Sequence, residues 1–479
     1  MLADDGNDAS HALSRRTLIR QGTAAAALLA LSPSWSDRLH AAAVRDTRPG
    51  HDSAERPYLA AALRAERWIA RSAMRDGGGL TWPADPVDPA SVQNNLYSGS
   101  PGVVLFYLEL HHATGDDVFL SHARAGADYL MASLPTEAAG LGDDGAGLYT
   151  GVAGVTYVLE MVRRATGDAR YAAGVARGVK LLRDSLVPMG QGASWNPSTD
   201  IISGTGGILL LLAWLDRSGS DWSSWRRDAG RAGERLLEVA TPEHGGLKWS
   251  ISDSVPRRYP NFSHGTAGVS YVLATLYKET GDRRYLDAAL AGERYLRTIA
   301  TVTPNDGLKI LHSEPGGEQL FYLSWCHGPA GTARLYQRLA DVTGDAAWRA
   351  NIGRLAQGII DSGVPERHPD RSGYWNNISQ CCGNCGISEF FLGLHQSTGD
   401  ARHLTFARRV VDNTLARATE DGDGLQWIQA EHRVRPELLI AQTGLMQGAA
   451  GVGLALLHLD GTMEKRRALV SLPDTPRWS

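Results

Sequence analysis

Apolar and polar residues follow a recurring two-segment pattern along this chain. In the first segment of each unit, such as residues 103–110, nearly every position is apolar. In the second segment, such as residues 119–134, apolar residues recur at helical spacing with polar residues between them. The first pattern predicts a buried α-helix, and the second predicts an amphipathic helix with one face in solvent.

Two glycine motifs separate these segments. A Gly-x-x-Gly motif precedes each apolar segment, and its first glycines, spaced 52 to 65 residues apart, are Gly99, Gly151, Gly204, Gly265, Gly328, Gly383 and Gly448. A Thr-Gly-Asp triplet follows in five units, with its glycine 16 residues further on, and Gly219 and Gly461 take its place in the third and seventh units. A left-handed glycine ends a helix and an aspartate caps the next one, so the triplets predict the junction between the two helices.

Seven such units predict a closed ring. A helix pair cannot cover its own apolar face until neighbouring pairs stack against it. We therefore expect an all-α fold, an (α/α) toroid or double barrel of seven helical hairpins. The Gly-x-x-Gly turns would gather at one end of the inner helices, and the residues just before each motif would line that mouth.

All four cysteines of the chain lie near two neighbouring motifs. The fifth unit opens with Trp325-Cys326-His327-Gly328, and the sixth opens with Cys381 and Cys382. Adjacent units of a ring would bring these three cysteines together, and three soft ligands with one open position are typical of a catalytic Zn²⁺ site. A disulfide and buried free thiols are the alternatives.

Two further residues stand close to this cysteine group in the sequence. Cys385 forms a Cys-x-x-Cys pair with Cys382, but the strand and helix of a thioredoxin-like redox site are missing around it. A packed small side chain is therefore the preferred role of Cys385. The sequence leaves open whether Cys385 or His327 joins the metal site.

These motifs resemble the lanthionine synthetase C-like (LanC-like) family. The resemblance rests on seven Gly-x-x-Gly units, the Trp-Cys-x-Gly of the fifth and the cysteine pair before the sixth, and it covers residues 57–465. It implies a helical double barrel that binds zinc through Cys326, Cys381 and Cys382. The last of these stands where the family usually has a histidine, which gives an all-sulfur ligand set.

The resemblance also implies a pair of proton-transfer residues, Asp200 and His264. The position of His264 supports this role independently, because it directly precedes a mouth glycine and would face the lumen of a ring. A helix cap or a core hydrogen bond is the alternative role for each residue. The chain departs from the family shortly before Cys326, where residues 321–324 are Phe-Tyr-Leu-Ser and the family's arginine is missing.

The charge balance argues against two classes of partner. The chain has 48 Lys and Arg against 52 Asp and Glu, a formal net charge of −4. Without a basic excess we expect no nucleic-acid partner and no binding to an anionic membrane surface. We expect no stable insertion into a membrane once a signal has been cleaved.

The first residues predict export. Arg15 and Arg16 precede a mildly apolar run at residues 22–31, and three alanines at residues 41–43 suit signal-peptidase cleavage. This arrangement predicts a twin-arginine signal and a periplasmic or extracellular location, with a disordered basic leader as the alternative. The expected division is a signal at 1–43, a linker at 44–56, the barrel at 57–465 and a tail at 466–479.

Three functions are compatible with these features. The first is an enzyme in which zinc activates a thiol, of a peptide or a small molecule, to add to a dehydroamino acid and form a thioether. The second is a peptide-binding toroid stabilised by zinc, which the missing arginine would allow. The third is a glycosidase, since similar helical barrels cleave sugars with two carboxylates, for which Asp143, Asp144, Asp200 and Glu389 are candidates.

Overall fold

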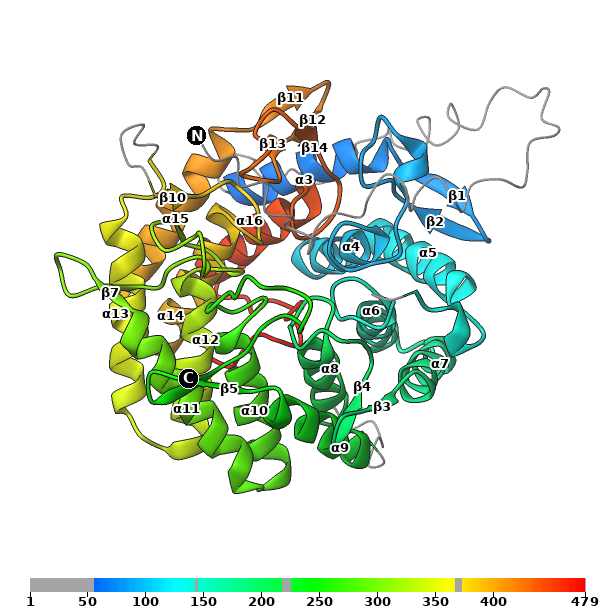
Figure 1. The fold of residues 1–479 in the computed structure, drawn as a ribbon. Helices are drawn as coiled ribbons and strands as arrows, with labels where there is room; N and C mark the ends of the chain where they lie inside the picture. The colour runs from blue at the N-terminus through cyan, green and yellow to red at the C-terminus, as the bar shows by residue number, and fades with distance from the viewer. Residues whose placement is uncertain (1–55, 143–144, 218–224, 367–372, 479) are drawn as a thin grey trace. The chain divides into compact units, whose positions relative to one another are not determined.

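The computed structural model describes residues 56–142, 145–217, 225–366 and 373–478, which fold mainly as α-helices (Figure 1). The inner helices are α4 (Ser100–Thr114), α6 (Val152–Thr166), α8 (Thr205–Arg217), α10 (Thr266–Thr280), α12 (Pro329–Thr343), α14 (Asn384–Thr398) and α16 (Ala449–Met463). The outer helices are α3 (Pro57–Ala70), α5 (Asp117–Ser133), α7 (Arg170–Asp184), α9 (Trp225–Glu238), α11 (Arg283–Ile299), α13 (Ala347–Asp361) and α15 (Ala401–Leu415).

The inner helices form a closed ring. Each one packs against the inner helix on either side, and α16 packs against α4 to complete the circle. The first eleven residues of α4 are all buried, as its continuous apolar pattern requires, whereas α11 buries one face only. The prediction of an all-α toroid of seven helical hairpins is confirmed.

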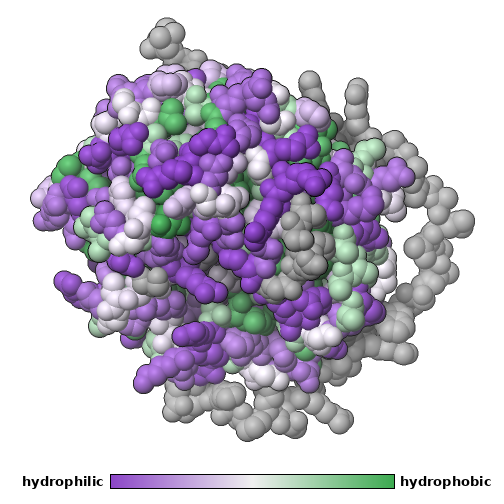
Figure 2. Space-filling view, turned by 90° about the horizontal axis from the view of Figure 1, so that it is seen from below, coloured by the Kyte–Doolittle hydropathy of each residue, from purple (hydrophilic) through white to green (hydrophobic). Residues whose placement is uncertain are grey.

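The polar faces of the outer helices give the ring a largely hydrophilic exterior. On the face shown in Figure 2, apolar residues lie in small, scattered groups. Within the described part of the chain, no helix is both long enough and apolar enough to cross a bilayer.

The seventh helix pair is assembled from segments far apart in the sequence. The inner helix α16 packs against α3, which takes the outer position that α5 takes beside α4. Arg56, just before α3, donates from Nε to Oδ1 of Asp460 in α16 at 3.1 Å. The ring is therefore closed by a contact between residues about 400 positions apart in the chain.

The helix-ending role predicted for Gly461 is wrong. The helix α16 continues through Gly461 to Met463. The chain turns back there, and a Cβ on Gly461 would be crowded because it would lie 3.1 Å from the carbonyl oxygen of Arg466. Gly219, for which the sequence predicts the same role, lies outside the described residues.

The Thr-Gly-Asp triplets end one helix and start the next, as predicted. Gly115 closes α4 in the left-handed conformation, with φ 71°. Asp116 then accepts a hydrogen bond from the backbone N–H of Val118 in the first turn of α5, at 3.0 Å. The glycines of the other four triplets, Gly167, Gly281, Gly344 and Gly399, adopt the same left-handed conformation.

In six of the seven Gly-x-x-Gly motifs, the second glycine permits close packing against the turn before it. A Cβ on Gly331 would lie only 1.9 Å from the carbonyl oxygen of Trp325, and a Cβ on Gly386 would lie 2.2 Å from that of Gln380. No side chain fits at these distances, so the motif holds these mouth turns tightly against the start of their inner helices.

The seven mouth turns are joined by a closed circle of backbone hydrogen bonds, which we call the mouth belt. Each turn donates an N–H to a carbonyl of the next turn at 2.8 to 3.1 Å. In order, the donor and acceptor pairs are Tyr97 to Tyr149, Tyr149 to Ile202, Ile201 to Ser263, Ser263 to Cys326, Cys326 to Cys381, Cys381 to Met446 and Met446 to Tyr97. The belt fixes the relative positions of turns from all seven hairpins.

Short β-strand pairs lie between the outer helices and the following turns. The antiparallel pairs are β1 (Met74–Asp76) with β2 (Gly79–Thr81), β3 (Val187–Met189) with β4 (Gly192–Ser194), β5 (Thr241–Glu243) with β6 (Gly246–Lys248), β7 (Thr301–Val302) with β8 (Leu308–Lys309), β11 (Thr419–Asp421) with β12 (Gly424–Gln426), and β13 (Ile428–Ala430) with β14 (Leu439–Ala441). The strands β9 (Phe321–Tyr322) and β10 (Tyr374–Trp375) pair in parallel.

Residues 464–478, which we call the tail, fold back against the inner helices. Glu109 in α4 accepts the backbone N–H groups of Leu469 and Val470, at 3.0 and 2.8 Å. At the far end of the tail, the ring of Trp478 packs 5.5 Å from that of Phe390 in α14. The tail, drawn in red in Figure 1, therefore spans the space that the inner helices enclose.

Candidate metal centre

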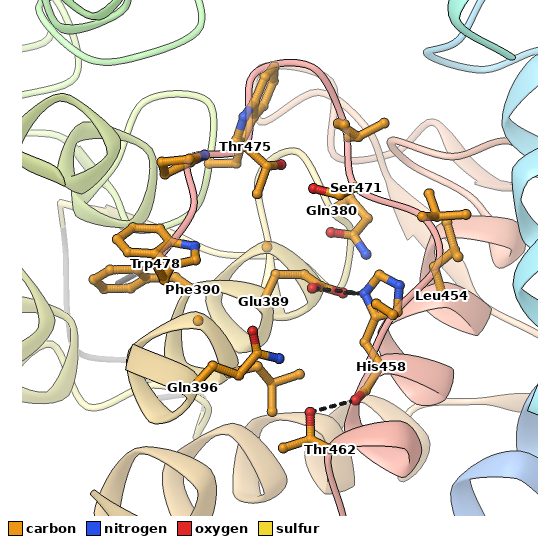
Figure 3. Close-up of a pocket in the computed structure, with 18 of the residues that line it drawn as sticks. Gln380, Glu389, Phe390, Gln396, Leu454, His458, Thr462, Ser471, Thr475 and Trp478 are labelled. Atoms are coloured by element: carbon orange, nitrogen blue, oxygen red, sulfur yellow. Dashed lines mark hydrogen bonds and ion pairs between the residues drawn. The ribbon is translucent and has the colours of Figure 1, made fainter. Parts of the chain in front are cut away.

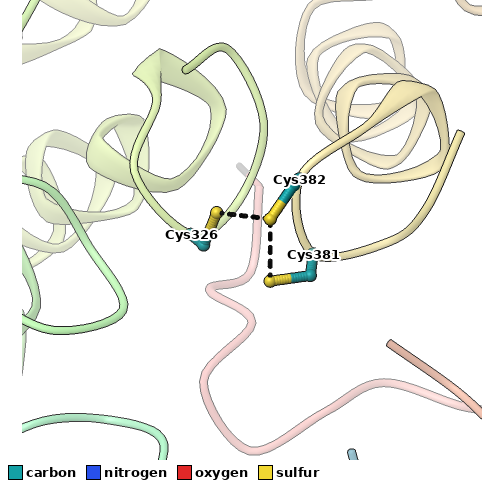
Figure 4. A group of neighbouring side chains, drawn as sticks. All are labelled: Cys326, Cys381 and Cys382. Atoms are coloured by element: carbon teal, nitrogen blue, oxygen red, sulfur yellow. Dashed lines mark hydrogen bonds between the residues drawn. The ribbon is translucent and has the colours of Figure 1, made fainter. Parts of the chain in front are cut away.

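Cys326, Cys381 and Cys382 lie together at the mouth (Figure 4). The Sγ atom of Cys382 is 3.2 Å from that of Cys326 and 3.4 Å from that of Cys381, and all three lie within 4.8 Å of one another. The side chains are buried, and none of the three forms a disulfide. The structure thus brings together the three cysteines that the sequence proposed as metal ligands.

The mouth belt holds two of these cysteines by their backbones. The N–H of Cys326 donates to the carbonyl of Cys381 at 3.1 Å, and the N–H of Cys381 donates to that of Met446 at 3.0 Å. The N–H of Cys382 donates to the hydroxyl of Ser379, also at 3.1 Å. The three sulfurs are therefore positioned by backbone contacts that do not depend on a metal.

The arrangement and chemistry of the three thiols fit a zinc ion. Sulfur ligands about 2.3 Å from a tetrahedral Zn²⁺ stand about 3.8 Å apart. Two sulfur pairs of the cluster are somewhat closer, at 3.2 and 3.4 Å, and the third pair lies within 4.8 Å. Burial raises the pKa of the Cys326 thiol well above its usual range, and the neighbouring thiols of Cys381 and Cys382 raise it further. A divalent cation reverses this effect, because it stabilises the thiolates that burial disfavours.

Cys385 and His327 do not belong to this group of ligands. Cys385 is buried in the first turn of α14, and burial, followed by the charge of Glu389, raises the pKa of its thiol. The ring of His327 packs between aromatic side chains, with centroids 4.6 Å from His312 and 4.9 Å from Tyr259.

Asp200 and His264 form a buried pair in the neighbouring turns. Nδ1 of His264 lies 2.5 Å from Oδ2 of Asp200. The other oxygen of Asp200 accepts the backbone N–H groups of Gly204 and Ser203, at 2.6 and 3.1 Å. The backbone of its own mouth turn thus fixes the carboxylate of Asp200, and this carboxylate orients the imidazole of His264.

This pair lies beside the turn that carries Cys326. The N–H of Ser263, next to His264, donates to the carbonyl of Cys326 at 2.8 Å. The imidazole of His264 stacks on that of His327, with centroids 5.4 Å apart. The candidate proton-transfer residues and the candidate metal ligands therefore occupy adjacent turns of the same mouth.

Sequence reasoning missed an aromatic cluster at this mouth. His312 packs between Tyr322 and His327, with ring centroids 4.3 and 4.6 Å away, and Tyr259 closes the group. His312 belongs to neither glycine motif, so no repeated pattern marks it. Tyr322 lies in the segment where the family's arginine is missing, and only that departure from the family pattern marks it in the sequence.

A second polar region lies between the tail and α14 and α16. A cavity of about 970 Å³ is lined there by Glu389, His458, Gln396 and Trp478 among others (Figure 3). Nδ1 of His458 lies 2.8 and 3.0 Å from the two oxygens of Glu389. Burial alone would lower the pKa of His458, but Glu389 and Glu109 outweigh it and raise the pKa to about 10.

Two of the four carboxylates considered for a glycosidase are held by histidines. Glu389 contacts His458 in the cavity, whereas Asp200 contacts His264 at the mouth. Asp143 and Asp144 lie outside the described residues.

Comparison with known proteins places the chain in a family. Residues 90–471 match the family model described as lanthionine synthetase C-like protein. The chain belongs to this family. No curated protein sequence matches the chain.

Solved structures of other proteins are similar to this chain to different degrees. Nisin cyclase is 16% identical with a TM-score of 0.59, over 83% of this chain and 92% of its own. An α-1,6-mannanase from Salegentibacter sp. HEL1_6 is 10% identical with a TM-score of 0.44, over 85% and 99%. An unsaturated glucuronyl hydrolase from Bacillus sp. GL1 is 17% identical with a TM-score of 0.44, over 65% and 85%. At these identities the similarity to nisin cyclase concerns the fold.

Proposed function

We propose that this LanC-like protein is a zinc-dependent enzyme that adds a thiol to a dehydroamino acid and so forms a thioether. The observation that carries the proposal is the meeting of three buried thiols, from two adjacent turns, beside a buried Asp200–His264 pair. A metal site next to an oriented acid-base group is what such an addition requires.

The cysteines and the histidine have separate tasks. Cys326, Cys381 and Cys382 would hold Zn²⁺, which, when bound, lowers the pKa of a substrate thiol and makes it nucleophilic. Addition forms a sulfur–carbon bond at the β-carbon of the dehydroamino acid and moves the π electrons to the α-carbon. His264 donates a proton to the α-carbon. Asp200 holds the imidazole of His264 in position while the imidazole loses and regains this proton. The proton released by the substrate thiol restores the acid.

A peptide is the substrate that we favour. Its support is family membership and a fold shared with a protein named nisin cyclase. A small-molecule thiol can replace the peptide cysteine in the same reaction. We place the activity outside the cytoplasm, because Arg15 and Arg16 stand in a segment typical of a twin-arginine signal.

One observation favours a second function, a zinc-stabilised peptide-binding toroid. The segment before Cys326 lacks the arginine that the family carries there. It contains Tyr322, which is buried against His312. No positive charge from residues 321–324 can therefore orient a substrate. A toroid of this kind would bind dehydroamino acid peptides without adding a thiol to them.

Metal analysis with a thiol-addition assay tests the proposal. Protein purified under reducing conditions should contain one zinc per chain and add glutathione or a peptide thiol to a dehydroalanine peptide. Cys381→Ala should lose both zinc and activity, while the matched variant Cys385→Ala should keep both. Zinc without thiol addition would support the binding toroid, and full zinc in Cys381→Ala would exclude the proposed site.

A further inference from the structure

The carboxylate of Asp474, in the tail, is completely buried behind the turn that carries Cys326. Its Oδ2 accepts hydrogen bonds from the indole N–H of Trp325 and from Arg334, both at 2.8 Å. Its Oδ1 accepts a hydrogen bond from the hydroxyl of Tyr149 at 3.1 Å. Three donors from two different hairpins thus converge on one carboxylate of the tail.

Two of these donors connect Asp474 to the mouth belt. Trp325 directly precedes Cys326, and Tyr149 is itself a member of the belt. The rings of Trp325 and Tyr149 pack against each other at 5.0 Å. In Figure 4 the tail, in faint red, runs past the cysteine cluster.

We propose that Asp474 is a positioning residue of the metal centre, which acts by fixing Trp325 and hence the turn that presents Cys326. The proposal rests on the proposed zinc function. It makes the tail a structural part of the centre, although no described tail residue is among the candidate ligands.

The number of donors explains why a carboxylate is needed at this position. Two carboxylate oxygens can serve Tyr149, Trp325 and Arg334 together, and the charge of Arg334 compensates the buried negative charge. An amide offers one acceptor oxygen and turns its NH₂ group toward at least one donor. Asp474→Asn therefore keeps the size of the side chain but disrupts the support of Trp325.

Glu109→Gln is a matched control. Glu109 is also a buried carboxylate that binds the tail, but it accepts hydrogen bonds from the backbone at Leu469 and Val470 instead of from Trp325. A variant that merely loosens the tail should behave like this control. A variant that releases the turn of Cys326 should not.

Zinc affinity, measured by competition with a chromophoric chelator, is the primary readout. Asp474→Asn should bind zinc about 10- to 100-fold more weakly than the parent, as expected when a residue supporting a metal ligand is lost. Glu109→Gln should bind zinc as the parent does. Trp325→Phe, which removes the indole N–H but keeps a ring, should resemble Asp474→Asn. The intensity of the thiolate-to-metal absorption of the Co²⁺-substituted proteins should change in the same two variants.

The outcomes separate this inference from the proposed function. A parent protein that binds no zinc overturns both. A parent that binds zinc, with equal affinity in Asp474→Asn and Trp325→Phe, overturns the positioning role alone. Equal weakening in Glu109→Gln and Asp474→Asn also overturns it, because the tail would then act only through general stability. If Asp474→Asn fails to fold, Trp325→Phe decides between these outcomes.

Discussion

Nδ1 of His264 lies 2.5 Å from Oδ2 of Asp200, and both side chains are almost completely buried. In the proposed reaction this contact orients the imidazole, and the second ring nitrogen exchanges a proton with the substrate. Along the mouth belt, His264 stands one turn away from Cys326, and Asp200 stands two turns away.

Replacing His264 should separate proton transfer from metal binding. We expect His264→Ala to retain zinc and to lower turnover by about 10²- to 10⁴-fold, the range typical of general acid-base catalysis. Elemental analysis and steady-state rates with a dehydroalanine peptide provide the test. His244→Ala, at a side chain that is 59% exposed, should retain the parent rate. Parent-like turnover in His264→Ala would assign this histidine a purely structural role.

The charged His458 should make the metal-free protein less stable as the pH rises into the alkaline range. Its pKa is raised from 6.5 to about 10 in the folded chain, so its contribution is complete below pH 6.5 and is lost as the pH rises through 10. The loss is at most about 5 kcal/mol, because a tenfold change in proton affinity corresponds to about 1.4 kcal/mol. Denaturant unfolding of the parent at pH 6.5 and pH 10 measures this change.

The free energy of unfolding should depend less on pH in His458→Gln, because glutamine places no positive charge beside Glu389 and Glu109. The cysteines titrate in parent and variant alike, so the difference between the two profiles isolates His458. His395→Gln is the control, because Nδ1 of His395 lies 3.0 Å from a backbone oxygen, that of Asp400. Identical profiles for the parent and His458→Gln would contradict the assigned charge.

Gly331 should tolerate no side chain. A Cβ there would meet the carbonyl oxygen of Trp325 at 1.9 Å and Cβ of Phe262 at 2.7 Å. Gly331→Ala should therefore lower the free energy of unfolding by about 1–3 kcal/mol, as overpacking does. Gly353→Ala, in α13 with nothing near the added methyl, should raise it by about 0.5–1 kcal/mol because alanine favours the helix. Urea unfolding measures both, and a stabilised Gly331→Ala would refute the packing argument.

The paired arginines should be required for export. Replacing both Arg15 and Arg16 by lysine preserves the charge but removes the pair that the twin-arginine pathway recognises, so the chain should remain in the cytoplasm. Cell fractionation locates the protein, and Arg20→Lys is the control within the same segment. Normal export of the double variant would show that another signal is used.

Local features of the fold were predictable because local interactions determine them. A left-handed glycine and a capping aspartate act within a few residues, so the end of α4 at Gly115 could be located from the sequence. The grouping of Cys326 with Cys381 followed from their positions just before successive glycine motifs. The Asp200–His264 contact was not predicted as such, although both residues precede adjacent motifs.

The remaining features depend on contacts between segments far apart in the chain. The pattern of α3 marks it as amphipathic but does not indicate that its partner is α16. Gly461 has the sequence context of a helix end, but in the structure it lies within α16, where the return of the chain at Arg466 crowds the position. The burial of Asp474 could not be foreseen, because its three hydrogen-bond donors are far from it in the sequence. They are Arg334 in α12 and Tyr149 and Trp325 in two different mouth turns.

Closure of the mouth belt has a consequence for folding kinetics. In an open array of repeats, stability can grow from neighbour to neighbour, but a belt without ends is complete only when the turns before α4 and α16 meet. Bringing such distant segments together has a large entropic cost and slows folding. Cys381 is tied to Met446, and Met446 to Tyr97, across the joining point. The three thiols should therefore reach their final arrangement late, and the rate of metal uptake during refolding should report the moment at which the ring closes.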